Sequence, residues 1–290
     1  MNKLSQSEKL RLSVVLATIN EEENIGRCLA SVKGFAGEMI VVDENSTDKT
    51  REIATNLGAK VFIEPHHEIF HITKEKALEK ASGEWILQMD ADEVVTPELA
   101  EDIKKVISNQ KLEISSGKKR LFERHQRLIE ERDGKIGGSG EVVGYFIPRR
   151  NIFLGKPLIH AGVYPDGVIR LVKKGFASFP QKSVHEQIKL DGKASWLSED
   201  LLHYDSPTLS KYLMRLNRYT DLHAKELEAK KVSKNVISYL LFTGYYPLVT
   251  FLRLYFRHLG FLDGVRGFLW SFFSASHFPI SYFKYLTFKG

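Results

Sequence analysis

An apolar run that ends in two aspartates constrains this chain more than any other feature. Residues 84–93 read EWILQMDADE, and residues 85–89 within them are apolar except for one glutamine. A short continuous apolar run is typical of a strand buried on both faces in a parallel sheet. Because side chains along a strand have a period of two, Asp90 and Asp92 are expected to face the same point in space.

Two interpretations of this aspartate pair follow from the residues alone. Hard cations such as Mg²⁺ and Mn²⁺ are held by one or two carboxylates together with the phosphates of a substrate, so Asp90 and Asp92 predict a divalent-cation site. Acids after an apolar strand also commonly form a loop or helix cap, and Thr96 with Pro97 is typical of a helix start directly afterwards.

Strands and helices are expected to alternate over the first hundred residues. The expected strands are 12–18, 39–42, 60–64 and 85–89, and the expected helices are 23–32, 49–57 and 73–81. This alternation predicts an α/β fold with a doubly wound, mostly parallel sheet, in which ligands collect at the carboxyl ends of the strands. Acidic clusters follow three of the four strands there, at residues 21–23, 43–44 and 90–93, which favours a functional site at this edge.

A glycine-rich phosphate loop does not follow any of these strands. Gly137, Gly138 and Gly140 precede an expected strand instead, at the end of a charged insertion over residues 109–140. A dinucleotide enzyme or a P-loop enzyme is therefore not expected. The charge of a bound nucleotide would have to be met by a metal ion, which favours the cation interpretation of Asp90 and Asp92.

Three motifs in order carry a resemblance to a known family. ATINEEENI, VVDENSTDKT and GEWILQMDADE occur within residues 12–100 at the expected spacing. This part of the chain resembles the nucleotide-sugar half of a family 2 glycosyltransferase of the GT-A fold, in particular bacterial enzymes that glycosylate the lipopolysaccharide core or lipid-linked glycans. The likeness continues more loosely through VIRLVKKG, SVHEQI and the segment LLHYDSPTLSKYLMRLNRYT.

The resemblance implies roles for individual residues. Asp43 would accept the nucleobase N–H, Thr18 and Glu21 would line the base and ribose pocket, and Asp90 would hold ribose or metal-bound water. Asp92 would be the principal ligand of Mg²⁺ or Mn²⁺. The chain departs from the family in having Glu44 where a second aspartate is common and Ile19 where a tyrosine is common. Residues 43–48 are also compatible with a simple turn and helix cap.

The acceptor side of the reaction is expected in residues 141–205. The resemblance places the catalytic base in SVHEQI, and we assign it to Glu186; the adjacent His185 is either a metal or phosphate neighbour or a structural residue. One carboxylate with in-line attack predicts inversion. Arg149 and Arg150 suit an anionic acceptor by bidentate contacts, or form an ordinary surface pair. His203 is a candidate phosphate contact.

The last sixty residues differ in composition from the rest. Residues 230–290 contain eight Lys or Arg, one acid, Asp263, and 17 of the 32 aromatic residues. After an amphipathic helix over 208–230, the uncharged runs 235–252 and 267–283 are short for a membrane span and contain Pro, Gly, Ser and Thr. They are expected either as core helices or, as we favour, as interfacial helices on an anionic membrane.

The expected organisation is a GT-A domain over residues 1–205, with a donor half at 12–108, followed by a helical membrane-associating region over 206–290. The lone cysteine, Cys28, is expected in the core and fits a reducing compartment, and no signal peptide is expected in the polar residues before the first strand. We therefore expect a cytoplasmic enzyme, peripheral on the cytoplasmic face of the membrane, whose partners are a nucleotide sugar and a glycan or lipid-linked acceptor, without nucleic acid. The alternatives are a non-catalytic membrane-bound relative and a sugar-phosphate nucleotidyltransferase; the latter would need a glycine-rich basic loop where this chain has NEEE.

Overall fold

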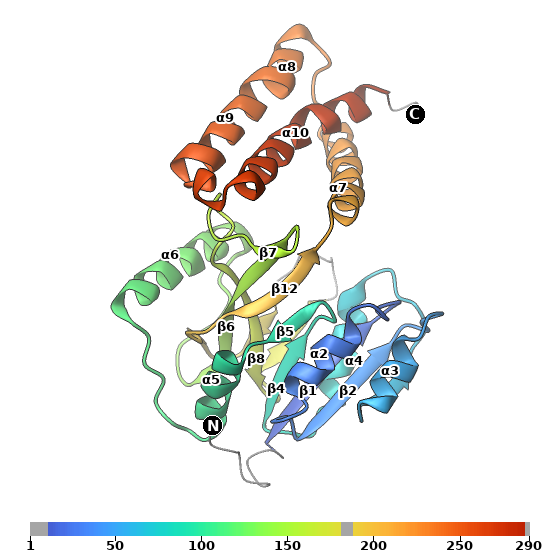
Figure 1. Ribbon diagram of the computed structural model, residues 1–290, viewed down its shortest axis with the longest axis vertical. Coiled ribbons are helices and arrows are strands. Elements are labelled where there is room, and N and C mark those ends of the chain that lie inside the picture. Colours follow the sequence, from blue (N-terminus) through green and yellow to red (C-terminus); the bar gives the residue numbers. More distant parts are fainter. Residues whose placement is uncertain (1–10, 181–187, 288–290) are drawn as a thin grey trace. The chain divides into compact units, whose positions relative to one another are not determined.

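A computed structural model describes residues 11–180 and 188–287 of the chain. The chain divides into two compact units. Unit 1 comprises Met1–Arg149 and Pro165–His203, and unit 2 comprises Arg150–Tyr164 and Tyr204–Gly290. Each unit has its own hydrophobic clusters. Figure 1 shows the helices and strands of the chain.

Unit 1 begins with the expected alternation of strands and helices. Its first elements are β1 (Leu12–Thr18), α2 (Ile25–Val32), β2 (Glu38–Asp43), α3 (Thr50–Asn56), β3 (Lys60–Ile63), α4 (Phe70–Glu79) and β4 (Trp85–Met89). The four strands pair in parallel in the order β3-β2-β1-β4, with Thr18 beside Asp43 and Leu16 beside Met89. The carboxyl ends of β1, β2 and β4 therefore lie next to one another, as predicted.

Antiparallel strands extend the sheet beyond β4. The remaining elements of the sheet are β5 (Glu93–Val95), β6 (Val142–Phe153), β7 (Lys156–Pro157), β8 (Asp166–Lys173), β11 (Lys193–Trp196) and β12 (Leu201–Ser206). The order continues β4-β8-β6-β12-β5, in which β8 is antiparallel to both β4 and β6, and β12 is antiparallel to β5. The sheet is therefore mixed: the four strands of the predicted nucleotide-sugar half are parallel, and in the later half β11 also pairs in parallel with β6.

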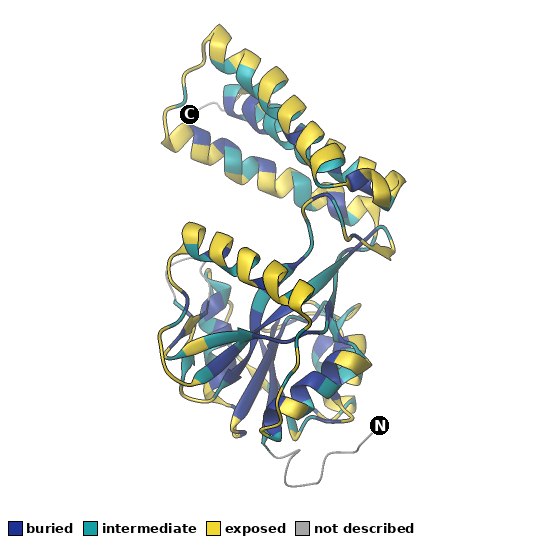
Figure 2. Ribbon diagram, turned by 90° about the vertical axis from the view of Figure 1, so that its left-hand side faces the viewer, coloured by how far each residue is buried: buried dark blue, intermediate teal, exposed yellow. Residues whose placement is uncertain are grey.

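Helices cover both faces of this sheet, because successive apolar side chains along a strand point to opposite faces and both faces need to be buried. Leu12, Val14 and Leu16 pack into one cluster with α2 and with α5 (Pro97–Ile107), whereas Val15 packs into a second cluster with α4 and α6 (Ser116–Asp133). Figure 2 shows the buried residues concentrated on the strands. Cys28 is fully buried in the first cluster, which confirms its expected place in the core.

The segment after β4 confirms two local predictions. The Thr96 hydroxyl accepts a hydrogen bond from the backbone N–H of Leu99 at 3.1 Å, and Pro97 occupies the first helical position of α5. The charged insertion forms α6, in which Phe122 and Ile129 are buried and most of the charges are exposed; the helix ends at Gly134 with φ 87°. A short hairpin of β9 (Ala177–Ser178) and β10 (Lys189–Leu190) completes unit 1.

Unit 2 is mainly helical. It contains α7 (Leu209–Ala229), α8 (Val236–Leu240), a π-helical turn η1 (Leu241–Tyr245), α9 (Tyr246–Leu252), a second π-helical turn η2 (Arg253–Arg257), a short 3₁₀ helix η3 (Gly260–Asp263) and α10 (Val265–Thr287). Its core joins α7 to α10 through Ala224, Leu227, Tyr282 and Tyr285, and Tyr212 packs edge-on against Phe153. Among the described residues no helix is long and apolar enough to cross a membrane.

Candidate active site

The loops that follow β1 and β2 are joined by a series of hydrogen bonds. The backbone N–H of Asn20 donates to Ser46 Oγ at 2.8 Å, and its side-chain oxygen accepts from the N–H of Thr47 at 2.9 Å. The N–H of Glu21 donates to Thr50 Oγ1 at 2.7 Å. Asn20 adopts φ 52°, a left-handed conformation that asparagine tolerates better than most residues. These contacts fix the shape of the edge at which the candidate nucleotide residues lie.

Asp43 and Thr18 contact each other directly at this edge. Thr18 Oγ1 donates to Asp43 Oδ2 at 2.9 Å, and Ser46 donates both its backbone N–H, to Oδ1 at 2.7 Å, and its hydroxyl, to Oδ2 at 2.6 Å. Asp43 is fully buried. This is the turn arrangement that the sequence allows for residues 43–48, and Arg51 Nε lies 3.8 Å from Oδ1.

Glu21 and Glu44 form further contacts in the loops that follow β1 and β2. Glu21 accepts a hydrogen bond from Asn24 Nδ2 at 2.8 Å. Glu44 is buried, accepts from Thr73 Oγ1 on α4 and lies 2.7 Å from His66 Nδ1. The side chain of Glu44 thus reaches across to α4, so its function in this structure is to hold the β2 loop against that helix.

Two basic side chains, Lys74 and Arg170, bind the Asp90 carboxylate, and neither was predicted from the sequence. Lys74 Nζ lies 2.6 Å from Asp90 Oδ1, and the Arg170 guanidinium binds Asp90 Oδ2. Arg170, on β8, also donates to Gln88 Oε1, and at 2.7 Å to Glu93 Oε1. Burial alone would raise the pKa of Asp90, but the charges of Arg170 and Lys74 outweigh it and hold that pKa well below its ordinary value.

Asp92 faces a different partner. Its Oδ2 lies 3.4 Å from Nε2 of His203 on β12, and the exposed fraction of its side chain is 24%. Burial would raise the pKa of Asp92, yet the hydrogen bond and charge of His203 lower it below its ordinary value, in spite of the nearby negative charge of Asp90. Asp92 is therefore anionic at neutral pH, and His203, a weaker candidate in the sequence, lies next to it.

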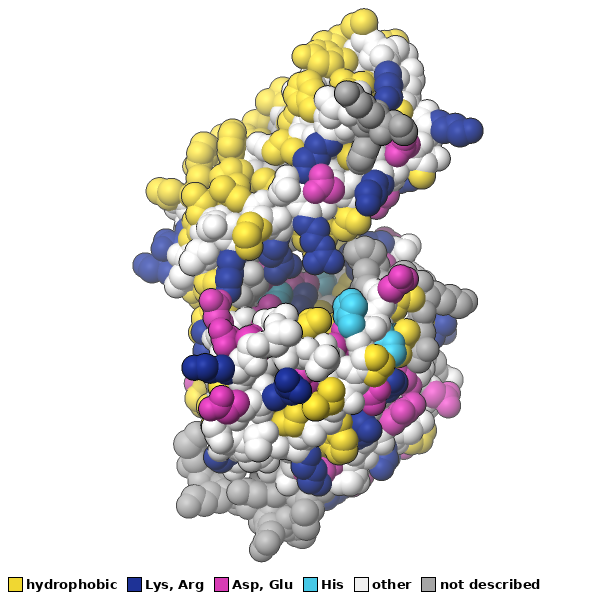
Figure 3. Space-filling model, turned by 90° about the vertical axis from the view of Figure 1, so that its right-hand side faces the viewer, with side chains coloured by type: hydrophobic (Ala, Val, Ile, Leu, Met, Phe, Trp, Pro, Cys, Tyr) yellow, Lys and Arg dark blue, Asp and Glu magenta, His cyan; other side chains and the backbone are white. Residues whose placement is uncertain are grey.

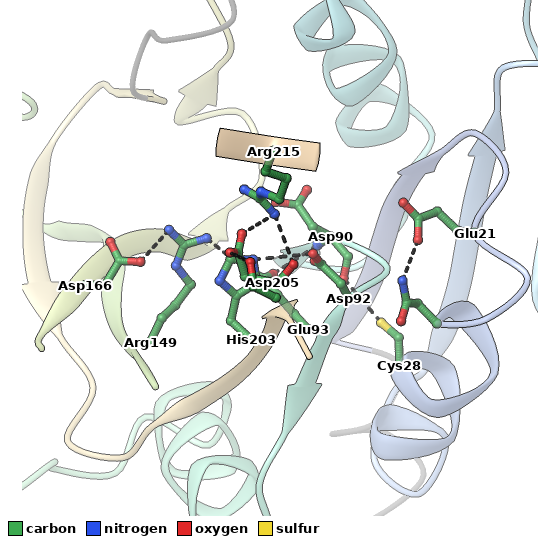
Figure 4. A network of polar contacts seen from close by, with 12 residues as sticks. Glu21, Cys28, Asp90, Asp92, Glu93, Arg149, Asp166, His203, Asp205 and Arg215 are labelled. Atoms are coloured by element: carbon green, nitrogen blue, oxygen red, sulfur yellow. Dashed lines mark hydrogen bonds and ion pairs between the residues drawn. The ribbon is translucent and has the colours of Figure 1, made fainter. Parts of the chain in front are cut away.

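The two candidate acceptor arginines belong to different units. Arg149 is in unit 1, where its guanidinium lies 2.7 Å from Asp166 Oδ2 and 3.5 Å from Glu93 Oε1, as Figure 4 shows. Arg150 is the first residue of the unit 2 segment and is half-buried. Glu186 and His185 lie outside the described residues, so the assignment of the catalytic base stays a prediction.

A test of whether these residues fit a divalent cation rests on their donor atoms. Over residues 11–180 and 188–287, no group of three or more His, Cys, Asp or Glu side chains is placed to hold a metal ion. Asp92 and His203 nevertheless offer one anionic oxygen and one imidazole nitrogen side by side, and Mg²⁺ or Mn²⁺ commonly takes its other ligands from substrate phosphates and water. Asp92 therefore fits a cation ligand, whereas both oxygens of Asp90 already contact cationic side chains.

Comparison with known proteins identifies the family. Residues 13–162 match the family model for glycosyl transferase family 2. The chain is 26% identical over 283 residues to the lipopolysaccharide core biosynthesis glycosyltransferase LpsC of Rhizobium meliloti (strain 1021), with 92% of each chain covered. The low-salt glycan biosynthesis hexosyltransferase Agl6 of Haloferax volcanii is 40% identical over 86 residues, which cover 28% of this chain and 21% of that protein.

The mannosyltransferase PcManGT from Pyrobaculum calidifontis, in complex with GDP-Man and Mn²⁺, aligns with a TM-score of 0.49 and 14% identity, over 97% of this chain and 88% of that one. The family match covers just over half of the chain, and the sheet has the parallel strands and the aspartate-bearing edge that the resemblance implies. The chain belongs to glycosyl transferase family 2 and is a glycosyltransferase with a GT-A fold.

Proposed function

We propose that this protein is an inverting, divalent-cation-dependent glycosyltransferase that moves a sugar from a nucleoside-diphosphate donor, with uridine as the preferred base, to a hydroxyl of a lipid-linked or lipopolysaccharide-type glycan. The observation that carries the proposal is the edge formed by β1, β2 and β4. There the anionic Asp92 lies beside His203, next to an Asp90 whose charge is balanced by Lys74 and Arg170.

On the donor side, the chain's own residues bind and orient. Thr18, Glu21 and Asp43 line the base and ribose pocket, and the Asp43 carboxylate accepts the base N–H. Asp90, kept ionised by its two cations, accepts a hydrogen bond from the ribose or from a metal-bound water. The hydrogen bonds between the β1 and β2 loops hold this pocket in shape before the donor binds, which reduces the ordering that binding requires.

Asp92 would hold the cation as its principal ligand, with His203 beside it and Asp90 nearby. A bound Mg²⁺ or Mn²⁺ supplies charge stabilisation for the departing nucleoside diphosphate. Because the pKa of Asp92 is lowered, this carboxylate is ready to bind a cation at neutral pH without first losing a proton.

On the acceptor side, Glu186 removes the proton of the attacking hydroxyl as the anomeric carbon is attacked in line. The result is inversion, hence a β-linkage from an α-linked donor. Arg149 and Arg150 are proposed contacts of an anionic acceptor. A lipopolysaccharide-type acceptor is supported by the name of the Rhizobium meliloti relative, which covers almost the whole chain. The enzyme is proposed to act as a peripheral protein on the cytoplasmic face of the membrane.

A donor screen by thermal shift tests the nucleotide site. UDP, GDP, CDP and TDP sugars are added with and without Mn²⁺ to the wild type, to Asp92→Asn and to Asp191→Asn, a control in the exposed turn after β10. We expect one donor to stabilise the wild type and the control in a metal-dependent way, by about 2.7 kcal/mol at about 100 times its Kd, and to lose this effect in Asp92→Asn. Metal-independent stabilisation that survives in Asp92→Asn would contradict the proposed role of Asp92.

Turnover separates the proposed enzyme from its rivals. A glycosyltransferase releases the nucleoside diphosphate from the selected donor, slowly even by hydrolysis, whereas a non-catalytic relative does not. A nucleotidyltransferase would instead form pyrophosphate from a nucleoside triphosphate and a sugar phosphate. The configuration of the product, read by NMR at the anomeric proton, tests the inverting course, and retention would refute it.

A further inference from the structure

The helical rod formed by α8, η1, α9 and η2 in unit 2 has an unusual outer face. A helix on a protein surface normally presents charged or polar residues to solvent. This rod carries no charged residue from Val236 to Leu252. Its exposed face is instead apolar, and its large members are Val236, Ile237, Leu240, Tyr245, Leu248, Val249, Leu252 and Phe256. We call this set the apolar face.

The apolar face continues onto the neighbouring end of the same unit. Helix η3 and the start of α10, which pack against η2 or α9, also expose large apolar side chains: Phe261, Leu262, Val265, Phe268 and Phe272. Figure 3 shows hydrophobic side chains gathered over one side of the helical unit. Contiguous exposed apolar surface of this kind is uncommon on monomeric soluble proteins and marks an interaction site.

Basic residues border the apolar face at both ends of the rod. Lys230, Lys231 and Lys234 precede it, and Arg253 and Arg257 lie at its far end; all five are exposed. The single acid of the region, Asp263, is engaged by His160, whose Nδ1 lies 2.8 Å from its Oδ1. Lys230 also lies 3.7 Å from Glu226 on α7. The net charge of residues 230–290 is nevertheless positive, so a partner with an anionic surface and an apolar interior fits this face.

We propose that the apolar face is a membrane-docking surface that lies in the plane of an anionic bilayer, with its apolar side chains among the acyl chains and its flanking lysines and arginines on the headgroups. Helices of this type enter the bilayer by about 5 to 10 Å without crossing it, and no described helix is suited to cross. This inference deepens the peripheral location proposed above and names the residues responsible.

The rod contains two π-helical turns, η1 and η2, and the first of them lies beside a proline. Pro247 lacks an N–H and cannot complete the regular helical hydrogen bond to Thr243. The π-helical turn η1 lies just before this proline, where the regular hydrogen-bond pattern is interrupted. The Thr243 hydroxyl donates to the Tyr239 carbonyl at 2.7 Å.

Vesicle flotation with matched variants tests the proposal. The probes are phosphatidylcholine vesicles with and without one quarter phosphatidylglycerol. Leu248→Glu/Leu252→Glu is compared with Leu213→Glu/Met214→Glu on α7, two exposed residues of the same unit that are outside the apolar face. Each variant replaces two exposed apolar side chains by glutamates, so the two variants add the same charge at different places on the unit. Circular dichroism and thermal melting of each variant verify that it is folded.

The expected result is binding of the wild type to anionic vesicles, a loss of about 100-fold or more in Leu248→Glu/Leu252→Glu, and a much smaller loss in the α7 variant. Arg253→Gln/Arg257→Gln should lower the partition coefficient on anionic vesicles by about fivefold per residue and leave binding to pure phosphatidylcholine unchanged. Equal losses in the two glutamate variants, or no vesicle binding by the wild type, would overturn the proposal.

Two further readouts separate this proposal from others. A second copy of the chain is the rival occupant of the apolar face, and it predicts a wild-type dimer in solution that Leu248→Glu/Leu252→Glu converts to monomer; sedimentation that shows this would overturn lipid docking. Vesicle binding is measured without donor, and nucleoside-diphosphate release is measured without vesicles. Failure of one assay therefore leaves the other result standing.

Discussion

At the scale of single residues, Arg170 is the group on which the charges around Asp90 depend. Its guanidinium is almost fully buried and contacts Gln88, Asp90 and Glu93. Removal of one partner from a buried ionic cluster leaves an uncompensated charge, which typically costs about 3 to 5 kcal/mol. We expect Arg170→Gln to lower the free energy of unfolding at pH 7 by about that amount, measured by urea denaturation.

A matched control and a pH series make this prediction specific. Arg132→Gln removes an arginine whose ion pair with Asp133 is exposed, and it should change stability by about 0.5 kcal/mol or less. Without Arg170 the pKa of Asp90 rises, so the loss in Arg170→Gln should shrink as the pH falls and this carboxyl takes up a proton. A loss that is constant with pH would mean that the arginine stabilises by packing alone.

Asp43 has two suggested roles, one in stabilising the turn of residues 43–48 and one in binding the nucleobase, and each can be measured separately. Asp43→Ala leaves the Thr18 hydroxyl and the Ser46 N–H buried without their acceptor, and each such group costs about 1 to 3 kcal/mol. We expect a corresponding loss of unfolding free energy, together with a loss of donor affinity of tenfold or more, measured by calorimetry on the folded variant at low temperature. Unchanged affinity would reduce Asp43 to a turn residue.

Some residues of the candidate site can be predicted from the sequence and others cannot, for a physical reason. Asp90 and Asp92 stand out because they end an apolar strand, and their neighbours in the sequence explain their position. Arg170 contacts residues 77 to 82 positions away, and the chain order contains no direct sign of those contacts. The signal that remains is its place in the apolar strand VIRLVK, since a charge buried there requires carboxylate partners.

At the scale of elements, Glu38 joins three strands at the start of β2. Its carboxylate accepts from Ser13 Oγ on β1 at 2.6 Å, from Lys60 Nζ on β3 at 2.9 Å and from the N–H of Ser82 before β4 at 2.7 Å. Burial pulls its pKa upward, but the hydrogen bonds from Ser13, Ser82 and Lys60 outweigh burial and lower the pKa to about 2.

A depressed carboxyl pKa makes stability depend on pH in one direction. Glu38 stabilises the fold fully above its unfolded pKa, about 4.3, and this contribution is lost as the pH falls toward its folded pKa of about 2. The stability difference between the wild type and Glu38→Gln should therefore be largest above pH 5 and shrink toward pH 2, by urea denaturation at each pH. Glu199→Gln, a half-exposed control, should show a much smaller pH dependence.

Elements formed by local contacts are the ones that the sequence predicts well. The β1 strand has the expected bounds, and the Thr96 cap begins α5 as expected. The antiparallel part of the sheet was not specified, because the order β8-β6-β12-β5 depends on pairing between strands far apart in the chain. Apolar runs in the tail predict helices correctly, but whether their outer side would be apolar depends on which side packs inward.

At the scale of the whole molecule, the two units of the chain differ in charge. Unit 1 contains the acidic edge of the sheet, while residues 230–290, in unit 2, contain eight basic residues and one acid. The backbone crosses between the units three times, yet each unit has separate apolar clusters. Units with separate cores are expected to unfold as separate cooperative transitions, on which different ligands act.

The three tryptophans allow this to be tested. Trp85 and Trp196 lie in unit 1, and Trp270 lies in unit 2 beside Phe153 and Tyr212. In Trp270→Phe, tryptophan fluorescence reports unit 1 alone; in Trp85→Phe/Trp196→Phe it reports unit 2 alone. We expect the selected donor with Mn²⁺ to raise the denaturation midpoint of the first variant only, because a ligand stabilises the unit to which it binds. Midpoints that rise together in both variants would mean that the chain unfolds as one cooperative body.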